Sequence, residues 1–75
     1  DAKSALQEKT QATRKLTPTY RVVKEDGPEH KKLFKVAVYF DSEFVAEGTG
    51  YSKQDAETEA AKAALEKIGD RGHTR

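Results

Sequence analysis

The fold is decided by residues 33–69, which read LFKVAVYFDSEFVAEGTGYSKQDAETEAAKAALEKIG. Over residues 33–40, bulky apolar side chains alternate with other residues, which is the period of a β-strand. The apolar face of this strand consists of Phe34, Val36, Val38 and Phe40. Residues 41–43 (Asp-Ser-Glu) then predict a short hairpin connection. We expect the next strand over residues 44–49.

A long helix is predicted after this hairpin, from Ser52 to about Ile68. Ser52 is a good N-cap residue, and Asp55 three positions later completes a Ser-x-x-Asp capping pattern. Gly69 suits the left-handed conformation that ends many helices. The apolar residues of the helix fall on one side, at Ala56, Ala60, Ala61, Ala64, Leu65 and Ile68. Because alanine is small, this side of the helix can approach a sheet closely.

The residues before this unit predict one more helix and one more strand. Residues 1–11 are good helix formers without Gly or Pro. Their short apolar stripe consists of Ala2, Ala5 and Leu6. Residues 20–24 favour a β-strand, and turn residues follow at 25–28. The predicted fold class is therefore α+β in the order α-β-β-β-α, with both helices packed on one face of a three-stranded antiparallel sheet.

The composition limits what kind of protein this is. With 75 residues the chain predicts one small domain, at residues 1–69, followed by a polar tail at residues 70–75. The net charge is only +1, from 14 basic and 13 acidic residues, so a nucleic acid would have to bind to a local patch. The chain has no cysteine, which excludes disulfides and thiolate zinc sites. No apolar run is as long as a membrane span or a signal sequence, so we expect a soluble, cytoplasmic domain with no membrane contact.

The acidic residues do not form a catalytic pattern. Metal-assisted hydrolysis needs several carboxylates that converge on one cavity. Here Asp55 and Glu59 lie four positions apart on a predicted helix, and residues 25–26 lie in a turn, which is typical of solvated surface acids. For this chain we therefore predict no catalysis, no metal or other cofactor, and no small-molecule ligand.

The first predicted helix carries a polar stripe that contains no cation. Its members, at positions i, i+3, i+4 and i+7, are Ser4, Gln7, Glu8 and Gln11. Amide and hydroxyl groups suit the wide minor groove of A-form RNA, which displays 2′-hydroxyls and base edges. The alternative interpretation is an ordinary solvated helix face.

Two further patches offer contacts to a nucleic acid. The turn at residues 27–30 (Gly-Pro-Glu-His) suits insertion into a shallow groove, with Lys31 and Lys32 reaching the flanking phosphates. Ser52 and Lys53 begin a helix, whose free amides and positive dipole end attract phosphate. The alternatives are a plain hairpin loop and a capped helix with a solvated lysine. A domain of this length should have a radius of gyration of ~11 Å and a diameter of about 30 Å, so three patches on one surface would span about one duplex turn.

These motifs, in this order, resemble the double-stranded RNA-binding domain, and within that family the C-terminal domain of bacterial ribonuclease III. The resemblance covers residues 1–68, nearly the whole chain. The motifs that carry it are Asp1-x-Lys3-Ser4-x-Leu6-Gln7-Glu8-x-x-Gln11, Gly27-Pro28-x-His30, Phe34-x-Val36-x-Val38, Gly48-x-Gly50-x-Ser52-Lys53, Ala56-Glu57 and Ala60-Ala61-x-x-Ala64-Leu65.

The resemblance implies which residues bind RNA. They are Ser4, Gln7, Glu8, Gln11, Gly27, Pro28, His30, Lys31, Ser52, Lys53 and Gln54. The residues of the first helix would contact one minor groove, the loop would enter the next, and the start of the last helix would hold the phosphates between them. Gln54 and Glu57 stand where many members of the family carry lysine, so we expect a weaker grip on phosphate.

The resemblance also implies a parent protein. That protein would be a magnesium-dependent, homodimeric endonuclease that processes ribosomal and messenger RNA. Its catalytic domain is not in these 75 residues, so this chain would be the part that binds double-stranded RNA.

Other binding modules fit the sequence less well. An RNA-recognition motif needs four strands and aromatic residues on the open face of its sheet, whereas Phe34 and Phe40 share the predicted core face. A KH domain needs a Gly-x-x-Gly loop, and the sequence has none. The alternative from a different class is a protein-interaction or dimerisation module of the same fold. Such a module would be expected to lose Lys53 and the His30 loop and to expose an apolar patch.

Overall fold

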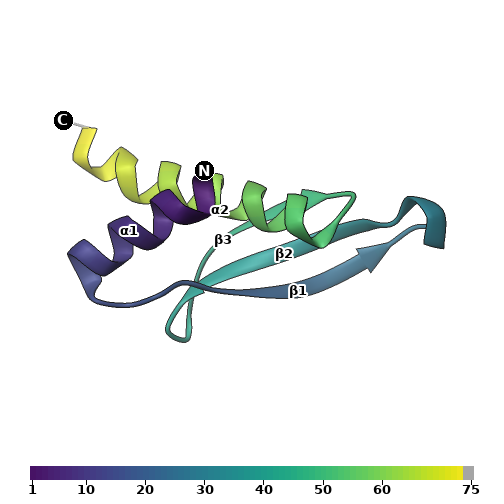
Figure 1. The fold of residues 1–75 in the computed structure, drawn as a ribbon, viewed down its shortest axis with the longest axis horizontal. Helices are drawn as coiled ribbons and strands as arrows, with labels where there is room; N and C mark the ends of the chain where they lie inside the picture. Colours follow the sequence, from purple (N-terminus) through teal and green to yellow (C-terminus); the bar gives the residue numbers. More distant parts are fainter. Residues whose placement is uncertain (74–75) are drawn as a thin grey trace.

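The computed structural model describes the backbone of residues 1–73 and the side chains of residues 1–69. The segment 70–75, predicted to be a polar tail, therefore lies outside the residues whose side chains are described. The elements follow the predicted order α-β-β-β-α, with a short 3-10 helix between the first two strands (Figure 1). Their bounds are α1 Ala2–Arg14, β1 Thr19–Asp26, η1 Glu29–Lys31, β2 Leu33–Phe40, β3 Glu43–Gly50 and α2 Lys53–His73.

The three strands form an antiparallel sheet in the order β1-β2-β3. Val36 in the central strand pairs with Val22 on one side and with Gly48 on the other, which sets the register of the sheet. The β2–β3 connection is a tight turn in which Asp41 has a φ of 56°, a left-handed conformation that aspartate tolerates better than most residues. β1 is longer than the predicted 20–24, because its pairing with β2 continues to Asp26.

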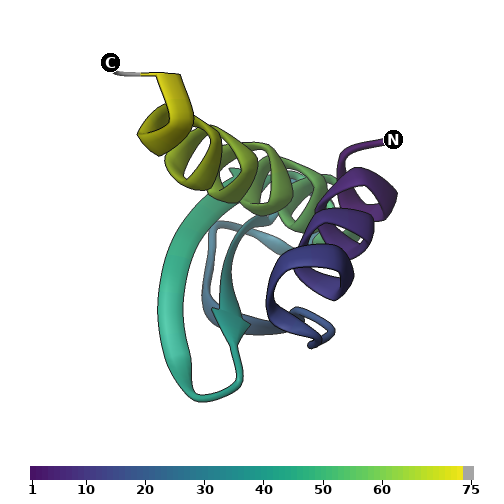
Figure 2. The same cartoon turned by 90° about the vertical axis from the view of Figure 1, so that its left-hand side faces the viewer.

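The core lies between α2 and the sheet, and both helices lie on the same side of the sheet (Figure 2). The residues that form this core are Leu6, Val36, Val38, Phe40, Val45, Ala46, Ala56, Ala60, Ala61 and Ala64. The alanine side of α2 is confirmed as its buried side. Gly48 allows the helix to come this close, because a Cβ at that position would lie 2.2 Å from the backbone nitrogen of Ala60.

The first helix packs mainly on α2, with Leu6 and Thr10 fully buried. The Thr10 hydroxyl donates a hydrogen bond to the carbonyl of Gln7 at 3.1 Å, so its burial leaves no unpaired donor. Ala5, predicted as part of the apolar stripe, is instead exposed. The helix ends at Arg14 and is followed by the C-cap residue Lys15, which is left-handed with a φ of 59°.

The predicted end of α2 at Gly69 is wrong, because the helix continues to His73. Glycine permits a left-handed cap but does not impose one. A Cβ at Gly69 would meet nothing within 4 Å, so no neighbouring group forces the chain to turn there.

The molecule is more elongated than the predicted sphere of about 30 Å. Its radius of gyration is 12.9 Å and its extents are 43 × 24 × 21 Å. The end of the β1–β2 hairpin projects beyond the helices and accounts for part of this length (Figure 1). A ligand that contacts both α1 and this hairpin must therefore be long.

Candidate nucleic-acid interface

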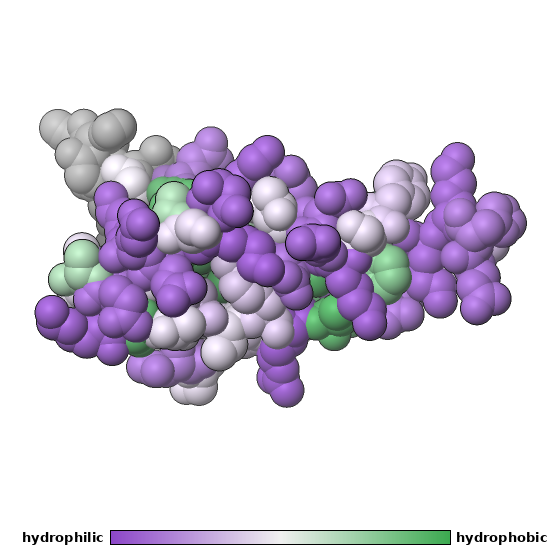
Figure 3. Space-filling model, viewed as in Figure 1, coloured by the Kyte–Doolittle hydropathy of each residue, from purple (hydrophilic) through white to green (hydrophobic). Residues whose placement is uncertain are grey.

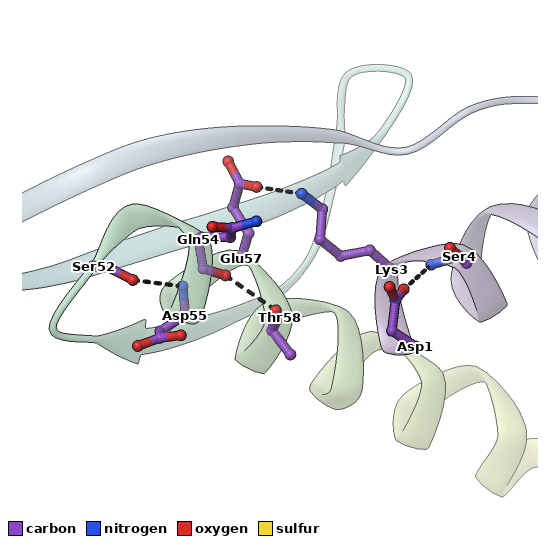
Figure 4. Close-up of polar contacts among 8 residues, drawn as sticks. All are labelled: Asp1, Lys3, Ser4, Ser52, Gln54, Asp55, Glu57 and Thr58. Atoms are coloured by element: carbon purple, nitrogen blue, oxygen red, sulfur yellow. Dashed lines mark hydrogen bonds and ion pairs between the residues drawn. The ribbon is translucent and has the colours of Figure 1, made fainter.

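The polar stripe of α1 lies on an exposed and capped helix. Asp1 is the N-cap, and its carboxylate accepts a hydrogen bond from the backbone N–H of Ser4 at 2.9 Å (Figure 4). The members of the stripe line one shallow hollow in the order Ser4, Gln7, Glu8 and Gln11. The Gln11 amide donates to the Thr17 hydroxyl at 2.9 Å, which orients the last member. The stripe therefore presents hydroxyl, amide and carboxylate groups in a row.

A second hollow, of about 370 Å³, lies between this stripe and the start of α2. Ser4 and Gln7 line it from α1, and Gln54 and Thr58 line it from α2. Because the two helices border the same hollow, the stripe and Gln54 face the same side of the molecule. This side is mainly hydrophilic where it carries the helices (Figure 3).

The start of α2 is built as predicted. The Ser52 hydroxyl accepts a hydrogen bond from the backbone N–H of Asp55 at 3.0 Å, which caps the helix (Figure 4). Lys53 follows on the first turn and is exposed, with its ammonium 5.9 Å from the centre of the Phe34 ring. No described carboxylate pairs with Lys53, so its charge is available to an anion.

The glycines before this helix allow β3 to pack closely against α2. A Cβ at Gly50 would lie 2.7 Å from the Cβ of Asp55, and Gly48 is in similarly close contact with α2. The Gly-x-Gly pattern therefore lets β3 run directly beneath the helix. The groups at this point whose chemistry suits an anion are the free N–H groups of the helix start and the Lys53 ammonium.

The β1–β2 loop is shaped by its glycine and proline. Gly27 has a φ of +98°, and a Cβ there would lie 2.8 Å from the carbonyl oxygen of Lys31. The backbone N–H of Lys31 donates to the carbonyl of Pro28 at 2.9 Å, which closes one turn of 3-10 helix. His30 and Lys31 are exposed on that turn, while Lys32 is 3.6 Å from the carboxylate of Glu25.

Tyr51 connects the loop with the start of α2 and was missed by the sequence analysis. It lines one hollow together with Gly27 and Lys31, and at 63% exposure it is the most exposed of the large hydrophobic side chains in the described part of the chain. The signal in the sequence was an aromatic residue directly before the capping Ser52. The three predicted patches thus follow one another along the molecule, from α1 through the start of α2 to the loop (Figure 1).

Glu57, near the start of α2, forms an ion pair with Lys3. Its carboxylate is 2.5 Å from the Lys3 ammonium, so the negative charge predicted to weaken phosphate binding is paired (Figure 4). Nearby, burial raises the pKa of the Tyr20 hydroxyl above its ordinary value of 10.0, and the charge of Glu57 raises it further. The Tyr20 hydroxyl is buried and has no hydrogen-bond partner in the described part of the chain.

Neither a cluster of candidate metal ligands nor a membrane-spanning helix is found among the described residues. Over these residues, no three His, Cys, Asp or Glu side chains come together as a possible metal site. Across the same residues, no helix is both long and apolar enough to cross a membrane.

Comparisons with known proteins agree on the family. The sequence profile described as "Double-stranded RNA binding motif" matches residues 2–68. The chain is 50% identical over 68 residues to Ribonuclease 3 of Sulfurovum sp. (strain NBC37-1), and 52% identical over 68 residues to Ribonuclease 3 of Dehalococcoides mccartyi. Each match covers 91% of this chain, which spans only about 30% of the length of those relatives.

Solved structures show the same arrangement of helices and strands. A structure of Arabidopsis HYL1, described for its implications for miRNA processing, has a TM-score of 0.77 and 38% identity, and the match covers 91% of this chain and 96% of that one. Dicer from Pichia stipitis has a TM-score of 0.70 and 29% identity, over 88% of this chain and 32% of that one. The predicted α+β fold is confirmed.

Proposed function

Because this chain belongs to the double-stranded RNA-binding motif family, we propose that it binds double-stranded RNA through the α1 stripe, the start of α2 and the β1–β2 loop. Recognition would rest on the shape of the A-form duplex, its 2′-hydroxyls and its phosphates. The contacting residues would be those named from the sequence, with Tyr51 added between the loop and α2.

One observation carries this proposal. The three patches lie one after another along a molecule whose longest extent is 43 Å. The stripe on α1, which contains no cation, comes first; Lys53 at the start of α2 and Lys31 in the loop follow, and neither lysine pairs with a described carboxylate. A long ligand with alternating grooves and phosphate rows suits such an arrangement, because each patch then meets the group that its chemistry favours. A single strand has no fixed alternation of grooves and phosphate rows.

We further propose that the chain is the substrate-binding part of a ribonuclease III. Its similarity to Ribonuclease 3 sequences supports this, with the chain matching about 30% of their length. The parent protein would then be an endonuclease of double-stranded RNA that processes ribosomal and messenger RNA in the cytoplasm. Its magnesium ions and its homodimer contacts would belong to a catalytic part outside these 75 residues.

The proposal is tested by comparing four ligands of equal length: duplex RNA, duplex DNA, an RNA–DNA hybrid and single-stranded RNA. We expect duplex RNA to bind most tightly. If about four phosphates are neutralised, raising the salt from about 50 to about 200 mM should weaken binding roughly a hundredfold. Equal affinity for duplex RNA and duplex DNA would contradict the role given to 2′-hydroxyls. No binding to any duplex would favour the protein-interaction module instead.

One variant tests the proposed groove contacts independently of the phosphate contacts. Gln7→Ala removes an amide that faces the hollow between the helices but carries no charge. We expect weaker binding to duplex RNA with the dependence on salt unchanged, because no counterion release is lost. The loss should be smaller for duplex DNA, which lacks the 2′-hydroxyls.

A further inference from the structure

An ion pair links the two helices at the edge of the proposed interface. The ammonium of Lys3 lies 2.5 Å from a carboxylate oxygen of Glu57 (Figure 4) and 5.3 Å from the centre of the Tyr20 ring. Lys3 and Glu57 are 54 positions apart in the sequence, so only the folded chain brings them together. Their side chains are 37% and 28% exposed, respectively, which leaves them partly shielded from water.

The pair joins the two helical segments that carry proposed RNA contacts. Lys3 directly precedes Ser4 on α1, and Glu57 lies one turn after Gln54 on α2. Because α1 packs mainly on α2, its direction depends on its contacts with that helix. Leu6 and Thr10 anchor α1 by burial, and Ala2 packs against the core near its start. The ion pair adds a polar link to α2 at that same end, where the proposed RNA contacts begin with Ser4.

The energetics point away from a role in general stability. Ion pairs that are partly open to water contribute little to the free energy of unfolding. The pair also leaves neither partner well placed to meet RNA by itself. The Lys3 ammonium is engaged by Glu57 and lies over the Tyr20 ring, and the Glu57 carboxylate is neutralised.

We propose that the Lys3–Glu57 pair is a positioning device, which holds the α1 stripe at the distance and angle from the start of α2 at which both can meet one duplex. This inference rests on the proposed RNA binding. Lys3 and Glu57 act through Ser4, Gln7 and Gln54 and do not contact phosphate themselves. Glu57 therefore supports RNA binding, contrary to what its charge suggests.

The test uses three variants of this chain: Lys3→Met, Glu57→Ala and the charge-swapped double variant Lys3→Glu/Glu57→Lys. The matched control is the Lys35–Glu47 pair, which joins β2 to β3 at 3.5 Å with side chains 40% and 43% exposed. Its variants are Lys35→Met and Glu47→Ala. Dissociation constants for duplex RNA are measured at low and high salt, and thermal unfolding is followed for every variant.

We expect Lys3→Met and Glu57→Ala each to weaken binding by up to about fivefold, because the pair can bias the position of the helices only by the small free energy that a partly exposed ion pair supplies. The dependence on salt should stay that of the original chain, and the charge-swapped variant should recover most of the affinity. Residual dipolar couplings of the free protein should show that α1 has changed its angle to α2 in the single variants. The control variants should change neither the affinity nor the couplings.

Three results would overturn the inference. Tighter binding by Glu57→Ala would mean that this carboxylate simply repels phosphate. A lower salt dependence in Lys3→Met, by about one unit, would mean that Lys3 contacts a phosphate directly. Losses no larger than those of the control pair would mean that the ion pair has no positioning role. If the original chain binds no duplex RNA, the proposed function fails instead, which is seen before any variant is made.

Discussion

The proposed interface has two regions that are held in place in different ways. The helical region, which consists of the α1 stripe and the start of α2, lies over the core, with Leu6 and Ala56 fully buried beneath it. The loop region, residues 27–31, lies at the end of a hairpin, and seven of the eight residues of β1 are exposed. Its form depends on the left-handed Gly27 and on one turn of 3-10 helix.

The difference shows that one binding surface can be preorganised by two kinds of force. Tertiary packing positions the helical region, so changes that loosen the core should affect folding and binding together. Local backbone geometry shapes the loop region, so it can be altered while the rest of the domain stays folded. Mutations can therefore separate the two regions.

The largest effect should come from Gly48→Ala, which acts on the packing beneath the helical region. The added Cβ would lie 2.2 Å from the backbone nitrogen of Ala60, so α2 must move away from β3. We expect the free energy of unfolding to fall by at least about 3 kcal/mol, measured by urea denaturation. The control is Gly69→Ala, where the added Cβ meets nothing within 4 Å. Because alanine favours a helix more than glycine does, this change should stabilise the protein by up to about 1 kcal/mol. Equal effects of the two changes would contradict the packing role of Gly48.

The next largest effect should come from Gly27→Ala, which acts on the loop region alone. Alanine disfavours a φ of +98°, and its Cβ would come within 2.8 Å of the Lys31 carbonyl oxygen. A left-handed conformation costs a non-glycine residue about 1–2 kcal/mol, so we expect duplex RNA to bind about tenfold more weakly. The melting temperature should fall much less than in Gly48→Ala. Unchanged binding would show that the loop is not part of the RNA interface.

A smaller effect tests whether both regions hold phosphate. Lys53→Ala in the helical region and Lys31→Ala in the loop region should each lower the salt dependence of binding by about one unit. The control is Lys62→Ala, because the Lys62 ammonium is 3.3 Å from Glu59 and lies outside the proposed interface. If only one of the two variants changes the salt dependence, the regions do not share the phosphate contacts.

The smallest effect concerns Tyr20, below the hollow between the helices. Burial, and to a smaller extent the charge of Glu57, raises the pKa of Tyr20 above 10.0 in the folded protein. As the pH rises, the hydroxyl therefore ionises in the unfolded chain before it ionises in the folded one. This group's contribution to stability is present below about pH 10 and is lost as the pH rises towards the raised pKa. The free energy of unfolding, measured by denaturation at about pH 9 and about pH 11, should fall more between these pH values in the original chain than in Tyr20→Phe. The same loss in both would contradict the shift.

Much of the fold could be predicted because it depends on local patterns. The alternation in residues 33–40 and the alanine side of α2 identify buried faces, and Ser52 is recognisable as a cap because its partner, Asp55, is only three positions away. The ends of elements were harder to place. Gly69 permits a cap without requiring one, so the sequence could not show that α2 continues to His73.

The site was predicted less completely, because its details depend on contacts between distant residues. The sequence does not show what Gly48 and Gly50 do, because their closest neighbours are residues of α2, which passes directly over them. The pairing of Glu57 with Lys3 cannot be deduced from spacing, since 54 positions separate them. The predicted diameter assumed a compact sphere and so missed the projecting hairpin.

The central claim is that the helical and loop regions meet the same duplex at the same time. It is tested most directly by titrating the protein with a short RNA duplex and following backbone amide signals by NMR. We expect the signals of Gln7, Gly27 and Lys53 to shift together, along one binding curve, while that of Tyr39 on the uncovered face of the sheet stays in place. Separate binding curves for the two regions, or shifts centred on Tyr39, would contradict the account.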